Sequence, residues 1–174
     1  MYYKLTEDLD NFSGILPVNY SMELASSFDG RSHAALWEPI HFEKMDKSDL
    51  RPLPEILTGY IPICSARVYE AIKDVCNNIV EFLPCTIGDE RLEYYVFNIL
   101  GSLDVVDYDR SIYQRFPSTG RIMFFKKLVF KETVEVPLFR IPDLPYTYFF
   151  CTEEFKVLLE GIDCRGAKFL SDMF

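Results

Sequence analysis

The chain reads ICSARVYEAIKDVCNNIVEFLPC from Ile63 to Cys85, and this stretch holds its clearest structural signal. Ser65 follows a short apolar run and is well placed as a helix N-cap, because its hydroxyl can accept a hydrogen bond from a first-turn amide. The apolar residues after it recur at three- and four-residue spacing, which predicts one buried helix face. They are Val68, Ala71, Ile72, Val75 and Cys76. Asn77-Asn78 tolerates the left-handed conformation that ends many helices, so Ile79–Cys85 is predicted to form the next strand.

The same order of elements is predicted again in FCTEEFKVLLEGIDCRGAKFL, from Phe150 to Leu170. Thr152 is the expected N-cap here, and Glu153 and Glu154 place negative charge at the positive end of the helix dipole. The two stretches align at one fixed offset without a gap, with Cys64 on Cys151, Ser65 on Thr152, Val68 on Phe155, Ile72 on Leu159 and Phe82-Leu83 on Phe169-Leu170. Only three of these aligned positions are identical. The alignment therefore supports duplication weakly, and a shared strand–helix–strand module more strongly.

The rest of the chain is predicted to consist of short strands joined by turns. Gly88-Asp89-Glu90-Arg91 is the expected turn into Leu92–Leu100, and Ser118-Thr119-Gly120 is the expected turn before a strand in Ile122–Phe130. Further strand candidates are Tyr2–Leu5, Ser21–Ala25, Glu38–Phe42 and Val134–Ile141. We therefore expect an α+β fold over residues 1–174, a single domain with a mixed, largely antiparallel sheet and two similar modules. Residues 1–50 form an irregular N-terminal part of it, and residues 51–174 carry both modules.

Composition and charge narrow the classes of function. Hydrophobic residues make up 49% of the chain and aromatic residues 16%, which is enough for a core and excludes disorder as the main state. The formal net charge of −9 argues against a nucleic-acid partner, which would require a basic surface. An acidic surface favours a cationic protein partner, although solubility alone is the simpler explanation of the charge.

A cytoplasmic protein is expected. The N-terminus, Met1–Asp8, lacks a basic region followed by an apolar stretch, and the longest apolar runs are too short to span a membrane. The five cysteines are scattered without a Cys-x-x-Cys pair, and His33 and His41 lie far from them. We therefore expect free thiols in a reducing compartment, with no zinc site and no cofactor.

The sequence contains no catalytic motif. There is no Gly-x-Ser-x-Gly elbow, no phosphate-binding glycine loop and no His-Glu-x-x-His, and neither histidine has a nucleophile close to it in sequence. We therefore expect that the protein is not an enzyme.

One polar run, Asp104–Ser111, is a candidate site. Its three carboxylates within six residues can supply oxygen ligands to a divalent cation, but it lacks the glycine and distal glutamate of a calcium loop. Three interpretations stay open: a structural corner at a strand end, part of a partner-binding surface, or a metal or catalytic site. The candidate partner-binding residues are Asp104, Asp107, Tyr108 and Asp109.

An ordered set of segments resembles a known family. The segments are Leu53–Leu57, Ile63-Cys64-Ser65, Val80–Pro84, Tyr94–Asn98, Asp104–Ser111, Leu138–Ile141, Cys151–Phe155 and Gly166–Phe169. In order and spacing they are similar to immunity protein family eleven of bacterial polymorphic toxin systems. The resemblance covers roughly residues 50–172, and the N-terminal third matches only loosely.

The resemblance implies a cytoplasmic antidote. Such a protein binds and neutralises the catalytic domain of a cognate toxin, which is typically encoded by the adjacent gene. The family supplies no catalytic residues to carry over. If the toxin is a nuclease, carboxylates of this chain are expected to occupy its basic phosphate sites.

Two other classes of function are kept beside this one. The first is a small metal-dependent hydrolase that uses Asp104, Asp107 and Asp109, and the second is a general protein-interaction module. The strand edges of the middle segment are compatible with a homodimer, while neither a nucleic acid nor a membrane is an expected partner.

Overall fold

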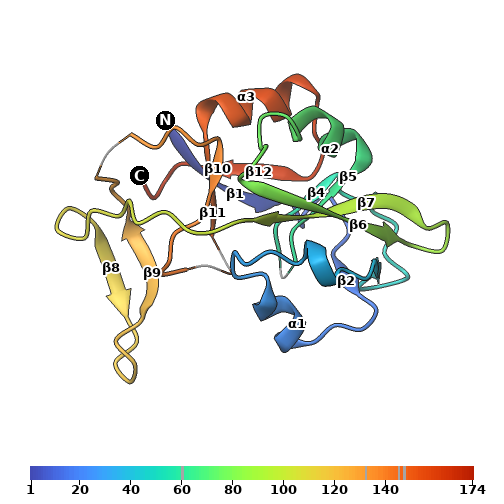
Figure 1. Cartoon of the computed structure of the whole chain (residues 1–174), viewed down its shortest axis with the longest axis horizontal. Coiled ribbons are helices and arrows are strands. Elements are labelled where there is room, and N and C mark those ends of the chain that lie inside the picture. The colour runs from blue at the N-terminus through green and yellow to red at the C-terminus, as the bar shows by residue number, and fades with distance from the viewer. Residues whose placement is uncertain (60, 132, 145, 147) are drawn as a thin grey trace.

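The computed structural model describes residues 1–59, 61–131, 133–144, 146 and 148–174. Three α-helices, one short 3₁₀ helix and twelve strands are found in these residues (Figure 1). In chain order they are β1 (Tyr2–Glu7), β2 (Ile15–Pro17), α1 (Met22–Ser27), η1 (Ala34–Leu36), β3 (Ile40–Lys44), β4 (Ile56–Leu57), β5 (Ile63–Ser65), α2 (Ala66–Ile72), β6 (Val80–Ile87), β7 (Leu92–Ile99), β8 (Ile112–Arg115), β9 (Ile122–Lys127), β10 (Leu138–Phe139), β11 (Phe149–Thr152), α3 (Glu153–Gly161) and β12 (Ala167–Leu170).

The strands form a mixed, largely antiparallel arrangement, so the predicted α+β class is confirmed. A six-stranded sheet has the order β2-β3-β6-β7-β5-β4, and β3 with β6 is its one parallel pair among the described strands. A four-stranded sheet has the order β10-β11-β1-β12, with every neighbouring pair antiparallel. The β8–β9 pair forms a separate two-stranded sheet.

In both predicted modules a strand, a helix and a strand follow one another along the chain. In the sheet, a further strand lies between the two strands of each module. β7 lies between β5 and β6, and β1 lies between β11 and β12. The registers agree, because Tyr94 faces Ser65 as Tyr2 faces Thr152, and Val96 faces Leu83 as Lys4 faces Leu170. The strand inserted in one unit follows the module directly, whereas that of the other comes from the opposite end of the chain.

The predicted N-caps are confirmed. The Val68 amide donates to Ser65 Oγ at 3.3 Å, and the Phe155 amide donates to Thr152 Oγ1 at 3.5 Å. Asn78 adopts the predicted left-handed conformation with φ of 67°, but α2 ends earlier than predicted, at Ile72, and Val75 is 49% exposed instead of buried. Both caps form because each hydroxyl accepts a hydrogen bond from a first-turn amide that has no partner within the helix.

Three apolar clusters hold the layers together. α2 and α3 lie side by side over one cluster, which includes Val68, Phe97 and Phe155 (Figure 1). The N-terminal segment with α1 covers the other face of the six-stranded sheet through a second cluster, and Trp37 Nε1 donates to the Pro84 carbonyl there at 2.9 Å. The third cluster joins β10 and β11 to the inner face of the β8–β9 hairpin.

Two strand predictions were wrong, one wholly and one in part. Ser21–Ala25 is not a strand: Ser21 caps α1, its Oγ accepting from the Leu24 amide at 3.0 Å, and Met, Glu, Leu and Ala all favour helix. Within Val134–Ile141 only Leu138–Phe139 pairs as a strand. β8, by contrast, was not predicted.

Among the described residues, no helix is long and apolar enough to cross a membrane, since the longest, α3, has nine residues.

Candidate partner-binding surface

The Asp104–Ser111 run forms a turn just before β8, and Asp107 accepts hydrogen bonds from other residues of the run. The Asp107 carboxylate accepts from the amides of Asp109 and Arg110 at 3.1 and 3.0 Å, and from Arg110 Nε at 2.6 Å. These hydrogen bonds, with that from the Arg110 side chain the largest cause, lower the pKa of Asp107. Asp107 therefore shapes the turn, and the structural interpretation of this residue has direct support.

The other three predicted residues have different surroundings. Asp104 is exposed and pairs with Lys131 at 3.3 Å, and Asp109 is exposed at the turn. The Tyr108 hydroxyl donates to Asp143 Oδ2 at 2.6 Å, and partial burial together with this bond raises the pKa of the phenol. The run thus offers two exposed carboxylates, while Tyr108 ties it to the loop after β10.

No metal-binding cluster is found in the part of the chain that the structure describes. Asp104 pairs with Lys131 and Asp107 with Arg110, and no group of three or more described His, Cys, Asp or Glu side chains lies where it could hold an ion. His33 Nε2 contacts the Ser27 carbonyl at 2.9 Å, and His41 Nδ1 contacts Thr86 Oγ1 at 2.9 Å, so both imidazoles serve the N-terminal layer. Burial raises the pKa of the Cys151 and Cys164 thiols to about 12, which leaves both protonated at neutral pH.

The β8–β9 hairpin follows the turn and stands apart from the two larger sheets (Figure 1). Its inner face is anchored, because Ile122 and Phe125 are buried and the Tyr113 ring packs edge-on to Phe125 with centroids 5.7 Å apart. Its remaining surface carries Phe116 and Phe124, which are 44% and 38% exposed. They are the two exposed residues among the chain's 15 phenylalanines.

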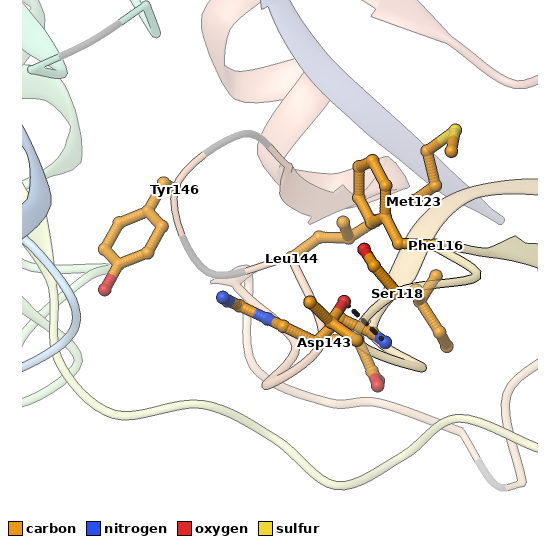
Figure 2. Close-up of a pocket in the computed structure, with 9 residues that line it drawn as sticks. Phe116, Ser118, Met123, Asp143, Leu144 and Tyr146 are labelled. Atoms are coloured by element: carbon orange, nitrogen blue, oxygen red, sulfur yellow. Dashed lines mark hydrogen bonds between the residues drawn. The ribbon is translucent and has the colours of Figure 1, made fainter.

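A recess of about 480 Å³ lies beside the hairpin tip. Figure 2 shows Phe116, Ser118 and Met123 from the hairpin on one side of it, with Tyr146 on the other. Leu144 and Asp143 line the recess between them, and Asp143 is the residue that holds Tyr108. The tip is shaped by a turn in which the amides of Thr119 and Gly120 both donate to the Phe116 carbonyl, at 3.3 and 2.9 Å.

Apolar recesses with exposed aromatic side chains are typical of protein-binding surfaces. None of the four predicted residues lines the recess, although Tyr108 reaches it through Asp143. The sequence predicted the Ser118-Thr119-Gly120 turn and the strand after it, but not β8 and therefore not the hairpin as a whole. One signal for its exposed tip was Phe116, which stands between Arg115 and the turn residues that follow it.

A known protein family matches most of the chain. A family model described as an immunity protein family (Imm11) matches residues 12–171. The chain therefore belongs to this immunity protein family, and the match extends into the N-terminal part, where the resemblance of individual segments was loose. Family membership implies the role of an immunity protein. No curated protein matches the sequence.

Proposed function

We propose that this protein protects the cell that makes it by binding a cognate bacterial toxin and blocking the toxin's action. The family match over residues 12–171 carries the proposal. The protein acts in the cytoplasm as an inhibitor without catalytic activity, and its partner is the catalytic domain of a toxin encoded by the adjacent gene. A surface with exposed aromatic side chains supports binding as the mode of action, because such residues supply much of the affinity of protein interfaces.

We further propose that the Asp104–Asp109 run borders the bound toxin. Asp104 and Asp109 are exposed at the rim, where Asp104 also pairs with Lys131, while Asp107 and Tyr108 hold the turn in shape. Rim charges contribute less to affinity than buried aromatic anchors, so Asp104→Asn with Asp109→Asn is expected to change the affinity by no more than a fewfold.

Co-expression tests the function. The neighbouring gene is expressed from an inducible promoter with and without this protein, and growth and complex formation are measured. Growth rescue together with a complex that persists through size-exclusion chromatography is the expected result. Light scattering on the same complex gives the stoichiometry and tests a homodimer formed through exposed strand edges. A neighbouring gene product that is harmless, or that does not bind, would contradict the proposal.

A further inference from the structure

Charge is distributed very unevenly along this acidic chain. Residues 110–131, which include the whole β8–β9 hairpin, contain six of the chain's 18 lysines and arginines and none of its 27 acidic residues. The hairpin is therefore a basic projection, while the rest of the chain carries all of the negative charge.

Four of these six cations have no charged partner within the described structure, and one of the four, Arg115, donates instead to the Gly120 carbonyl at 2.6 Å. Arg121, Lys126 and Lys127 are exposed and make no ion pair with a described residue. Arg110 and Lys131, at the two ends of the segment, pair with Asp107 and Asp104. The unpaired cations thus lie on the hairpin itself, next to its exposed phenylalanines.

The fold presents these side chains rigidly. An isolated two-stranded hairpin is marginally stable in water, but the inner face of this one packs into the cluster with Phe130, Phe139 and Phe150. Tyr108 and Tyr113 pack edge-on with centroids 5.9 Å apart, which fixes the base of the hairpin to the preceding turn. Pre-organised aromatic residues lose little conformational entropy when a partner covers them.

We propose that the β8–β9 hairpin is the docking element for the toxin, and that it binds an acidic protein surface whose carboxylates surround an apolar patch. This inference rests on the function proposed above. The net acidity of the chain had suggested a cationic partner, whereas the hairpin indicates an acidic partner surface. Phe116 and Phe124 provide the apolar anchors, and the recess beside the tip receives apolar side chains of the partner. Arg121, Lys126 and Lys127 pair with its carboxylates.

A protein partner fits these features better than a nucleic acid. A nucleic acid is a long polyanion that would also meet the acidic remainder of the chain, whereas a local acidic patch on a protein needs to match only the hairpin. Lys126 and Lys127 also protect the edge of β9 from pairing with other chains. That role does not require a cation, because glutamate at an exposed edge protects it as well, so charge reversal separates the two roles.

The charge test compares two double variants of equal net charge. Lys126→Glu with Lys127→Glu reverses the charge of the hairpin. Lys47→Glu with Arg91→Glu makes the same change in net charge at the far end of the molecule, where Arg91 lies in the β6–β7 turn and Lys47, which pairs with Glu43 at 2.8 Å, lies in the neighbouring loop after β3 (Figure 1). Binding of the purified toxin domain encoded by the neighbouring gene is measured by surface plasmon resonance between about 0.05 and about 0.5 M salt. The hairpin variant is expected to bind at least about tenfold more weakly, mainly through slower association, while the control matches the wild type.

The apolar test uses the same probe. Phe116→Ala with Phe124→Ala is expected to weaken binding by about tenfold or more, chiefly through faster dissociation. Leu36→Ala with Leu50→Ala removes two side chains that are even more exposed, at 93% and 98%, and is expected to bind as the wild type does. Circular dichroism and urea unfolding verify that all four variants are folded.

The outcomes separate this inference from the proposed function. Wild-type binding and rescue with unchanged affinity in both hairpin variants would overturn the hairpin as docking element and leave the proposed function standing. A wild-type protein that neither binds nor rescues would overturn both. Binding of duplex RNA or DNA that the Lys126→Glu, Lys127→Glu variant loses would also overturn the inference, by assigning the hairpin to a nucleic acid.

Discussion

At the scale of single residues, one buried carboxylate joins the two units. Glu55 is 6% exposed, and its oxygens accept from Arg67 Nε and Nη2 at 2.7 and 2.5 Å and from the Arg165 amide at 3.0 Å. Arg67 also donates to the Ile162 carbonyl at 2.6 Å. The helix of one module is thereby bound to the helix–strand connection of the other.

Glu55→Gln is expected to lower the free energy of unfolding by about 1–3 kcal/mol at neutral pH, since a neutral amide cannot accept from both guanidinium groups and leaves partly buried donors without their charged partner. The arginines are half-exposed, which keeps the effect below that of a wholly buried ion pair. Glu70→Gln is the matched control, because its partner Lys73 and its carboxylate lie at the surface, and it should change stability by less than about 0.5 kcal/mol. Urea unfolding measures both.

The same carboxylate makes stability depend on pH. Burial raises the pKa of Glu55, but hydrogen bonds and charge from Arg67 and Arg165 outweigh it, so the pKa lies below its ordinary value of 4.5. The unfolded chain then binds more protons than the folded chain just below pH 4.5, so the stabilisation is present above this pH and disappears as the pH falls through the pKa of the folded state. The stability difference between wild type and Glu55→Gln should therefore shrink in urea titrations below pH 4.5. A difference that stayed constant there would contradict the ion pair.

Arg140 is a second buried charge. It is 1% exposed, and its guanidinium donates to the carbonyls of Phe28 and Ile99 and to Asn98 Oδ1, which ties the end of α1 to β7. Burial lowers its pKa to about 10, still high enough for a full charge at neutral pH. Arg140→Met should cost about 2–4 kcal/mol in urea unfolding, because three buried acceptors lose their donor. Arg140→Lys keeps the positive charge but replaces the planar guanidinium, with its several donors, by a single ammonium group. A lysine variant as stable as the wild type would therefore contradict this account.

At the scale of elements, the two N-caps are directly comparable. Ser65→Ala and Thr152→Ala each remove the acceptor of one first-turn amide, and each is expected to cost about 1 kcal/mol in urea unfolding. Ser102 is exposed, so Ser102→Ala is a suitable control with an expected change below about 0.5 kcal/mol. Equal losses in the control and in the caps would show that the hydroxyl groups do not cap the helices.

Elements with local signals were predicted well from the sequence. α2, α3 and the β6–β7 turn depend on a cap, an apolar stripe and a glycine, all within a few residues of one another. α1 was mistaken for a strand because SMELA alternates in polarity, and the cap at Ser21 carried the better signal. β8 was missed because its four residues are all at least partly exposed, so it has no buried face to produce a pattern.

At the scale of the whole molecule, the position of β1 between β11 and β12 could not be predicted from the sequence. Tyr2 pairs with Thr152 and Lys4 with Leu170, and no local pattern specifies a register between residues so far apart. The charge distribution, in contrast, could have been read from the sequence. A net charge of −9 conceals the basic hairpin, which becomes visible only when acidic and basic residues are counted segment by segment.

The termini lie close together in the folded chain. The rings of Tyr2 and Phe174 are 6.2 Å apart between centroids, so a short flexible linker can join residue 174 to residue 1. In a chain joined in this way, β11, α3, β12 and β1 follow one another just as β5, α2, β6 and β7 do. If the two units fold in equivalent ways, the unit of β11, α3, β12 and β1 should tolerate a direct connection from β12 to β1, as the other unit has from β6 to β7.

A circular permutant with that linker and new ends between Lys47 and Ser48 is therefore expected to fold. The new ends fall in an exposed loop, so the native hydrogen bonds of both sheets are retained. Because the entropy of loop closure depends weakly on loop length, its free energy of unfolding should stay within about 2 kcal/mol of the wild type in urea titrations followed by circular dichroism. New ends between Phe97 and Asn98 are the control, because they cut buried β7 and should abolish cooperative unfolding. If the Lys47–Ser48 permutant behaved like this control, either the connection from Lys44 to Ile56 would be required for folding, or β1 could not follow β12 as β7 follows β6.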